Sequence, residues 1–149
     1  VPLIINDRID VALALDADGV HLGRSDMPAE VARRLLGPDK IIGLSLNKPA
    51  DILEDAVSFA NYLAVSPVFF TATKTDITEP WGLEGIRRAR SMTAMPLVAI
   101  GSVTKYNARE VVKAGADSVA VVSAIVAVDD PEGAAKELVR EVRKGKGRI

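Results

Sequence analysis

The stretch PLVAIGSVTKYNAREVVKAGADSVAVV, residues 96–122, alternates between two sequence patterns. Leu97–Ile100 and Ser118–Val122 are uncharged and rich in β-branched residues, which is typical of strands buried on both faces of a parallel sheet. Between them, the apolar residues of Asn107–Ala114 recur at helical spacing. The stretch therefore predicts a strand–helix–strand unit with a right-handed crossover.

The same alternation extends along the rest of the chain. Further uncharged, strand-like runs are Leu3–Ile5, Gly19–Leu22, Ile41–Leu46 and Tyr62–Val68. Helical spacing is found at Asp10–Leu15, Pro28–Leu36, Asp51–Phe59, Leu83–Arg90 and Pro131–Lys144. The order of these elements predicts an α/β fold in which each βα unit has roughly twenty residues.

Two segments of the chain resemble each other. Pro2–Asp7 leads to Ala17–Val20, and Pro96–Gly101 leads to Ala116–Val119 in a similar way. Repeated βα units favour a (β/α) barrel over a dinucleotide-binding sheet, and the fingerprints G-x-G-x-x-G and G-x-x-x-x-G-K-[ST] are absent from the sequence. The strand-like runs are too few for the eight-stranded barrel. Either two units precede Val1, or the fold is a shorter doubly wound sheet.

Composition narrows the class of protein. Of the 149 residues, 48% are hydrophobic and 26% are charged, which is typical of a globular domain with its own core. The 19 basic and 20 acidic residues nearly cancel, whereas a nucleic-acid-binding protein usually has a basic surplus. Cysteine is absent, which excludes disulfides and cysteine nucleophiles. No apolar run approaches the length of a membrane helix, so we expect a cytoplasmic protein that binds neither membranes nor nucleic acid.

Polar groups or a bare glycine backbone end each predicted strand, where ligands bind in parallel α/β folds. The residues concerned are Asn6, Asp7, His21, Asp26, Ser45, Thr71, Thr73, Lys74, Gly101, Ser102, Val122 and Ser123. Asp7 and Asp26 follow neighbouring strands, and two carboxylates suit Mg²⁺, which also takes water and phosphate oxygens as ligands. Alternatively, Asp7 caps the next helix and Asp26 begins a turn before Pro28. The additional cation Lys74 favours the metal site.

Two other groups of strand ends have features of phosphate binding. Thr71, Thr73 and Lys74 place two hydroxyls and an ammonium in one short loop, although the loop could also be a polar surface segment. Gly101 and the pair Val122–Ser123 end the last two strands, where barrels commonly bind phosphate through backbone N–H groups. We therefore expect a phosphorylated ligand at this end of the sheet.

The single histidine, His21, ends an apolar run. This position is as consistent with a hydrogen-bonded structural role as with acid–base catalysis. Neither a Ser-His-Asp grouping nor a cysteine nucleophile can be assembled from the sequence. We therefore expect positioning and charge stabilisation to dominate any catalysis.

These motifs resemble those of the thiamine-phosphate synthase family, also called thiamine-phosphate pyrophosphorylases. The resemblance covers essentially the whole chain. It is carried by IND at 5–7, ADGVHLG at 17–23 with Asp26, GLS at 43–45, PVF at 67–69, TATK at 71–74, AIG at 99–101 and VVSAI at 121–125. The T-x-T-K loop and the N-D pair with its later aspartate are the most specific of these motifs.

The resemblance implies a (β/α)8 TIM barrel, of which this chain would cover about six βα units from the third strand onward. Residues 1–149 would then form a single barrel domain without its first two βα units. The implied reaction couples 4-amino-2-methyl-5-hydroxymethylpyrimidine pyrophosphate with thiazole phosphate, through a dissociated pyrimidine cation, to give thiamine phosphate and pyrophosphate. The implied partners are these small molecules, and a homo-oligomer remains an alternative to a monomer.

The resemblance also assigns roles to individual residues. Asp7 and Asp26 would bind Mg²⁺. The pyrimidine pyrophosphate would be held by Asn6, Ser45 and Lys74, of which Ser45 and Lys74 would take part in catalysis. The thiazole phosphate would be held by Thr71, Thr73, Gly101, Val122 and Ser123.

The sequence departs from the family pattern in two places. The family's Q-L-R-x-K strand, which adds positive charge to the pyrophosphate site, has no counterpart here. Ser102 stands where the family usually has a second glycine, so a positive φ there would strain the serine. Three alternatives stay open: a thiazole tautomerase on the same barrel, a non-catalytic binder of thiazole phosphate or thiamine phosphate, and another phosphate-binding barrel such as an indole-pathway enzyme.

Overall fold

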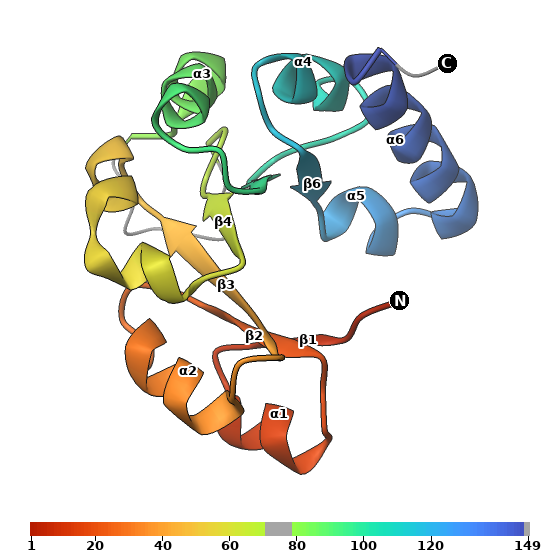
Figure 1. The fold of residues 1–149 in the computed structure, drawn as a ribbon. Coiled ribbons are helices and arrows are strands. Elements are labelled where there is room, and N and C mark those ends of the chain that lie inside the picture. Colours follow the sequence, from red (N-terminus) through yellow and green to blue (C-terminus); the bar gives the residue numbers. More distant parts are fainter. Residues whose placement is uncertain (71–78, 148–149) are drawn as a thin grey trace. The chain divides into compact units, whose positions relative to one another are not determined.

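A computed structural model describes residues 1–70 and 79–147, and the chain divides into two units, Val1–Ala64 and Val65–Ile149 (Figure 1). Both units alternate strands with helices, which confirms the predicted α/β class. Within the described ranges, no helix is long and apolar enough to span a membrane.

The first unit is built on three parallel strands. Strand β1 (Ile4–Asn6) pairs with β2 (Gly19–Leu22), and β2 pairs with β3 (Ile41–Leu46), so that Asn6 lies opposite His21 and His21 opposite Gly43. Since the strands run parallel, their carboxyl ends meet at one edge of the sheet. This edge carries the polar residues that the sequence places after each strand.

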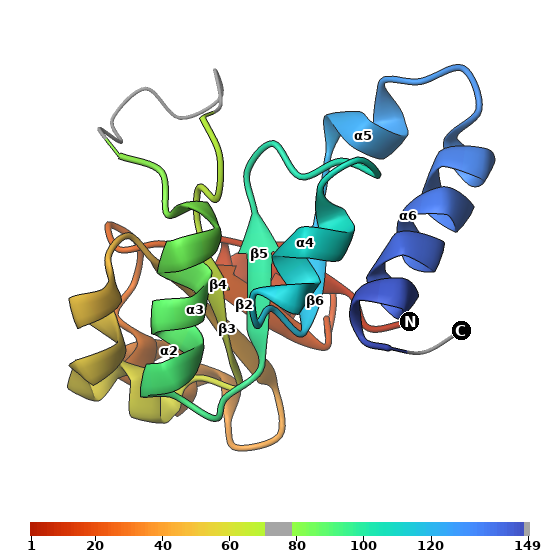
Figure 2. The same ribbon diagram turned by 90° about the horizontal axis from the view of Figure 1, so that it is seen from above.

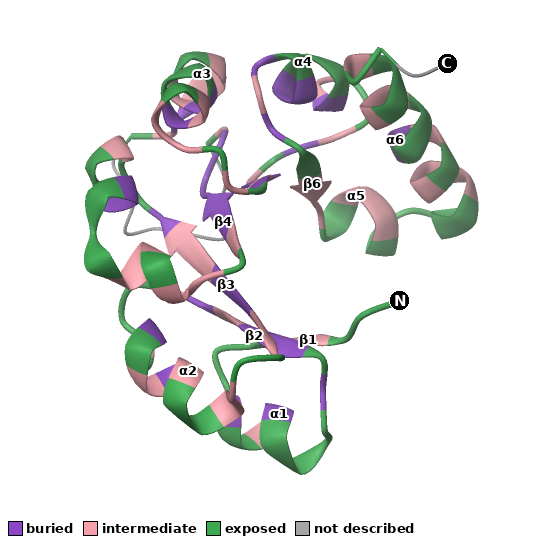
Figure 3. Cartoon of the chain, viewed as in Figure 1, coloured by how far each residue is buried: buried purple, intermediate pink, exposed green. Residues whose placement is uncertain are grey.

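Two helices cover one face of these strands. Helix α1 (Ile9–Ala14) packs on β1 and β2, and α2 (Ala29–Leu36) packs on β3 (Figure 1). Their core contains the fully buried side chains of Val20, Leu22 and Ile42. Burying one side chain of this size contributes roughly 1.5–3 kcal/mol. In Figure 3 the buried residues of α2 lie on one side of the helix and its exposed residues on the other.

The predicted helix over Asp51–Phe59 is wrong. Two short 3₁₀ helices, η1 (Pro49–Leu53) and η2 (Asp55–Phe59), replace it, and Glu54 between them has extended backbone angles (φ −78°, ψ 146°). The Asp51 carboxylate accepts hydrogen bonds from the backbone N–H groups of Asn47 and Lys48, which fixes a tight first turn. Leu53, an apolar residue of the predicted helix, is 75% exposed.

Strand β4 (Tyr62–Val65) lies at the boundary of the two units. It is shorter than the predicted run Tyr62–Val68, because Pro67 has no N–H to donate to a strand ladder. The residues after β4 bond to residues 100 and 101: Val68 N–H donates to Ile100 O, and Phe69 N–H donates to Gly101 O.

The second unit contains a parallel strand pair and four helices in its described part. Strand β5 (Leu97–Ile100) pairs with β6 (Ser118–Ala120). The helices are α3 (Gly82–Met92), α4 (Ala108–Lys113), α5 (Ser123–Val126) and α6 (Pro131–Gly145). Helices α4 and α6 lie side by side (Figure 2). Strand β6 is two residues shorter than predicted, because the backbone at Val122 (φ −116°, ψ −78°) is no longer extended and leads into α5.

The internal resemblance of the sequence has a structural basis. In the first unit the Asp18 carboxylate accepts a hydrogen bond from the backbone N–H of Leu3, with an N···O distance of 2.6 Å. In the second unit the Asp117 carboxylate accepts the same kind of bond from Leu97, at 2.8 Å. Each aspartate therefore connects the start of one strand to the start of the next. The repeated Ala-Asp pair in the sequence thus corresponds to a repeated βα unit in the structure.

Candidate active site

The carboxyl end of β1 carries Asn6 and Asp7, both of which are exposed. Asp7 has a positive φ of 64°, and the N–H of Arg8 donates to Asn6 O at 2.7 Å, which closes a three-residue turn around Asp7. Asp7 N–H donates to His21 O at 2.9 Å and so ties this turn to β2. A non-glycine residue in such a turn costs about 1–3 kcal/mol, and strain of this kind clusters at functional sites. The turn is therefore a candidate for holding a ligand.

Asp26 lies in the loop between β2 and α2. Its Oδ2 accepts a hydrogen bond from Gly23 N–H at 2.6 Å, so the loop backbone fixes the orientation of the carboxylate. A carboxylate held in this way keeps its second oxygen for a ligand. The sequence alternative, in which Asp26 begins a turn, is also present in the structure, because Asp26 N–H bonds back to Gly23 O.

The sequence predicts metal binding at this edge through Asp7 and Asp26. In the ranges 1–70 and 79–147, no three or more His, Asp or Glu side chains are grouped so that they could hold a metal ion. Such a cluster suits a metal that is coordinated by protein alone. Mg²⁺ instead binds through one or two carboxylates and completes its shell with water and substrate phosphates. Asp7 and Asp26 offer carboxylates of the kind that Mg²⁺ prefers, and the metal site stays a prediction.

Asp26 and Ser45 line one cavity of about 310 Å³ in the first unit, which we call the Ser45 pocket. Its charged lining also includes Arg24, Asp51 and Glu54. The structure therefore brings together a predicted metal ligand and a predicted pyrophosphate-binding residue. Asn6 and Asp7 are absent from this lining.

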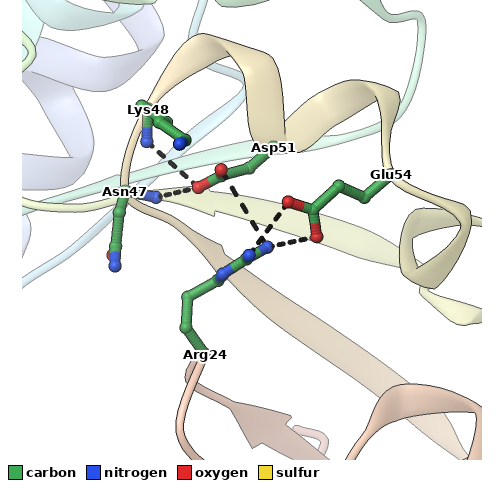
Figure 4. Close-up of polar contacts among 5 residues, drawn as sticks. All are labelled: Arg24, Asn47, Lys48, Asp51 and Glu54. Atoms are coloured by element: carbon green, nitrogen blue, oxygen red, sulfur yellow. Dashed lines mark hydrogen bonds and ion pairs between the residues drawn. The ribbon is translucent and has the colours of Figure 1, made fainter.

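Arg24 ties the loop after β2 to the segment after β3 (Figure 4). Its guanidinium donates two hydrogen bonds to the Glu54 carboxylate, at 2.5 and 2.9 Å. This bidentate pair lowers the pKa of Glu54 and raises that of Arg24, in each case chiefly through the hydrogen bonds between them. Arg24 Nη1 also lies 4.0 Å from Oδ1 of Asp51.

Asp51 is the most deeply buried of Arg24, Asp51 and Glu54, with 1% of its side chain exposed. Its Oδ2 accepts from Asn47 N–H at 2.8 Å and from Lys48 N–H at 3.1 Å (Figure 4). Its Oδ1 has no hydrogen-bond partner among the described protein atoms. The carboxylate thus holds the turn that follows Ser45, while Arg24 supplies the nearest positive charge.

His21 and Ser45 project from neighbouring strands and contact each other. His21 Nε2 lies 2.9 Å from Ser45 Oγ, and His21 Nδ1 lies 3.0 Å from the hydroxyl of Tyr62. The histidine therefore makes the hydrogen bonds that the structural interpretation of the sequence predicts. Burial raises the pKa of Tyr62, so its hydroxyl keeps its proton.

In the second unit, Gly101, Val122 and Ser123 line one cavity of about 300 Å³, which we call the Gly101 pocket. Its polar lining also includes Ser66, Ser102 and Thr104. Gly101 has a φ of 110°, and a Cβ at this position would lie 2.6 Å from Cβ of Pro67. Glycine is therefore required for the close approach that shapes the pocket.

Ser102 follows with a φ of 51°, which confirms that this departure from the family pattern places a serine in a conformation favoured by glycine. Its Oγ donates a hydrogen bond to Phe70 O at 2.6 Å, which partly offsets the strain. The three other residues predicted to bind phosphate, Thr71, Thr73 and Lys74, lie outside the described residues.

The fold and the polar strand ends define a parallel α/β protein with a candidate ligand site at the carboxyl ends of its strands. The family model described as thiamine monophosphate synthase matches residues 1–125. The chain belongs to this family.

Individual relatives agree with this assignment. The chain is 57% identical over 138 residues to the thiamine-phosphate synthase of Albidiferax ferrireducens, and 51% identical over 138 residues to that of Chloroflexus aurantiacus. In both comparisons the match covers 93% of this chain and 63% of the relative, so the chain spans less than two thirds of these proteins. The thiamine phosphate pyrophosphorylase structure from Pyrococcus furiosus has a TM-score of 0.85 at 44% identity, over 95% of this chain and 67% of that one.

More distant structures share the fold alone. The 3-hexulose-6-phosphate synthase from Salmonella typhimurium has a TM-score of 0.66 at 18% identity, over 92% of this chain and 67% of that one.

Four residues described above were not predicted from the sequence: Arg24, Asp51, Glu54 and Tyr62. Tyr62 is a polar aromatic residue that opens an otherwise aliphatic strand, and this could have marked it. Arg24 lies two residues from Asp26 in a loop that was already singled out. Neither signal identifies the contact partner, because Tyr62 and Arg24 meet residues far away in the sequence.

Proposed function

We propose that the protein is a cytoplasmic, Mg²⁺-dependent transferase that couples 4-amino-2-methyl-5-hydroxymethylpyrimidine pyrophosphate with thiazole phosphate. The products are thiamine phosphate and pyrophosphate. The observation that carries the proposal is the family membership, since relatives 51–57% identical over 93% of the chain are thiamine-phosphate synthases. The two pockets support it, because each contains residues that the family resemblance assigns to one substrate.

The finer fold that we propose is the (β/α)8 barrel, with this chain contributing about six of the eight βα units. The TM-score of 0.85 against the pyrophosphorylase structure supports this proposal. In such a barrel the ligand site is formed by the loops at the carboxyl ends of the strands. The proposed site residues of both units follow strands in this way.

In the proposed reaction the pyrimidine pyrophosphate is held by Asn6, Ser45 and Lys74. Ser45 donates a hydrogen bond to it, and Asn6 orients it from the end of β1. Lys74 provides positive charge for the leaving pyrophosphate. Asp7 and Asp26 would hold Mg²⁺, which when bound neutralises charge on the pyrophosphate oxygens.

The second unit binds the thiazole phosphate in this proposal. Gly101 lets the backbone approach the phosphate closely, and Val122 and Ser123 offer backbone N–H groups where α5 begins. Thr71 and Thr73 add hydroxyl donors. Holding both substrates removes much of the entropic cost of bringing them together, so positioning provides a large part of the rate enhancement.

The proposal is tested by mass spectrometry of the purified protein incubated with both substrates, once with Mg²⁺ and once with a chelator. We expect thiamine phosphate with Mg²⁺ and none with the chelator. Asp26→Asn should reduce turnover at least about tenfold, and higher Mg²⁺ should partly restore it, because the variant loses one anionic metal ligand. Asp39→Asn is the control, since Asp39 is exposed in the loop before β3.

The alternatives give different outcomes in the same assay. A non-catalytic binder would bind thiazole phosphate without forming product and without responding to Mg²⁺. A thiazole tautomerase would isomerise its thiazole substrate in the absence of the pyrimidine substrate. Either outcome would contradict the proposed coupling reaction.

A further inference from the structure

We propose that Tyr62, acting through His21, positions the hydroxyl of Ser45 so that it donates its hydrogen to a ligand in the Ser45 pocket. Neither Tyr62 nor His21 needs to touch that ligand, so both are positioning residues. The identity of the ligand as the pyrimidine pyrophosphate rests on the proposed function. The direction of the hydrogen bonds is independent of the proposed function.

Three side chains from three strands form a continuous chain of hydrogen bonds. The hydroxyl of Tyr62 at the start of β4 lies 3.0 Å from Nδ1 of His21 on β2. Nε2 of the same ring lies 2.9 Å from Oγ of Ser45 on β3. Both distances are within the normal range, and both nitrogens of the imidazole are engaged. The proton position on the ring therefore links the hydroxyl of Tyr62 to that of Ser45.

Gly43 makes this arrangement sterically feasible. It lies directly opposite His21 in the β2–β3 pair, between the strands that carry His21 and Tyr62. A Cβ at Gly43 would lie 2.1 Å from Cζ of Tyr62 and 2.4 Å from its hydroxyl oxygen. The tyrosine ring thus occupies the space that any other residue at this position would fill. There it stacks on the histidine ring, with the centroids 5.6 Å apart and the planes at 23°.

The direction of the chain follows from counting hydrogens. If Tyr62 donates to Nδ1, then Nε2 carries the ring hydrogen and donates it to Ser45 Oγ. The hydrogen of Ser45 is then left for a ligand, and Ser45 lines a pocket. In the reverse direction, Ser45 donates to Nε2 and Nδ1–H donates to Tyr62, so that the hydrogen of Ser45 is used within the chain of hydrogen bonds and none is left for the pocket.

The arrangement suits a ligand that accepts hydrogen bonds. Burial raises the pKa of Tyr62, which keeps the phenol protonated and able to donate at neutral pH. A phosphate oxygen accepts hydrogen bonds and offers no hydrogen when it is ionised. A serine whose oxygen already accepts from His21 can only donate to such a group, so its hydroxyl is oriented before the ligand arrives.

The first test uses nitrogen NMR of the imidazole, and it does not require activity. His21 is the single histidine of the chain, so its two ring nitrogens give unambiguous signals in long-range proton–nitrogen spectra. At pH 8, where an ordinary imidazole is neutral, we expect Nε2 to be protonated and Nδ1 to be unprotonated. A hydrogen on Nδ1 in the unaltered protein would overturn the proposal. Tyr62→Phe, which removes only the hydroxyl, should shift this tautomer preference.

The second test is a double-mutant cycle on the coupling reaction. Tyr62→Phe should lower kcat/KM for the pyrimidine pyrophosphate about tenfold, roughly the effect of one hydrogen bond, and leave the KM for thiazole phosphate unchanged. In the Ser45→Ala background, Tyr62→Phe should have no further effect, because the group that it positions is gone. Tyr106→Phe is the matched control, since Tyr106 is 86% exposed.

The proposal and the proposed function can fail separately. Losses that multiply in the double mutant, or a change in both KM values, would mean that Tyr62 acts through general structure and would overturn the relay. If the unaltered protein formed no thiamine phosphate, the proposed function would fail, while the NMR result would still decide the direction of the hydrogen bonds.

Discussion

In the first unit the polar and charged lining of the Ser45 pocket consists of side chains, namely a serine, an arginine and five carboxylates. In the second unit the Gly101 pocket owes its shape to backbone, since Gly101 and Ser102 both have positive φ and Gly101 lies against Pro67. The two units nevertheless share a βα repeat in which Asp18 and Asp117 make the same strand-to-strand bond.

This difference shows that one βα framework can form two kinds of pocket. A site made by side chains should lose binding when a functional group is removed. A site made by backbone should tolerate the loss of a side chain but not the addition of a Cβ. Substitutions in and around the two pockets test this contrast.

The largest effect is expected at Gly101. Gly101→Ala should lower the free energy of unfolding by about 3 kcal/mol, because the new Cβ would meet Pro67 and the residue would keep a positive φ. Gly82→Ala is the matched control, since Gly82 also has a positive φ (59°) but has nothing within 4 Å of its Cβ position. It should cost only about 1 kcal/mol in urea unfolding. Equal costs at the two glycines would refute the steric argument.

In the first unit we expect the largest effect on stability at Asp51. Asp51→Ala removes the acceptor of two backbone N–H groups and should cost about 2 kcal/mol. Asp51→Asn keeps one oxygen for these donors and places an amide at the oxygen that has no described partner, so it should cost about 1 kcal/mol or less. Thermal unfolding of both variants measures this difference. If Asp51→Asn destabilises the protein as much as Asp51→Ala, the stabilisation comes from the negative charge near Arg24 and not from the two backbone hydrogen bonds.

Two substitutions at Ser102 distinguish the cost of backbone strain from the contribution of a side-chain hydrogen bond in the Gly101 pocket. Ser102→Ala keeps the positive φ and loses the bond to Phe70 O, so it should destabilise the protein by about 1 kcal/mol. Ser102→Gly loses the same bond but relieves the strain, so its stability should stay within about 0.5 kcal/mol of the unaltered protein. Chemical denaturation would contradict this account if glycine proved as costly as alanine.

The smallest effect is a pH dependence from the Arg24–Glu54 pair. Since the folded protein lowers the pKa of Glu54 below its ordinary value of about 4.3, the pair stabilises the fold above that pH. The contribution is lost as the pH falls through the lower, folded pKa. We therefore expect Glu54→Gln to be slightly less stable than the unaltered protein at pH 7 and equally stable in strong acid. A difference that stayed constant over this range would exclude the charged pair as its cause.

The sequence by itself predicted much of the framework. The strands Gly19–Leu22, Ile41–Leu46 and Leu97–Ile100 have the predicted bounds, and their parallel pairing is confirmed. These features follow from local periodicity, which is a property of neighbouring residues. The grouping of Gly101 with Val122 and Ser123 was also predicted, because parallel strands bring their carboxyl ends to one edge, whereas the pairing of Asp7 with Asp26 stays a prediction. The roles of these residues in binding stay predictions.

The tertiary structure alone decided how the polar groups are connected. His21 meets Ser45 and Tyr62, which are 24 and 41 positions away, and Arg24 meets Glu54, which is 30 positions away. The split of Asp51–Phe59 into two short helices likewise depends on where the Asp51 carboxylate finds its donors. Local patterns specify which residues have functional groups and on which face of an element they lie. Which groups come within hydrogen-bonding distance depends on strand register and on the space left by residues such as Gly43, and these are set by the packing of distant segments.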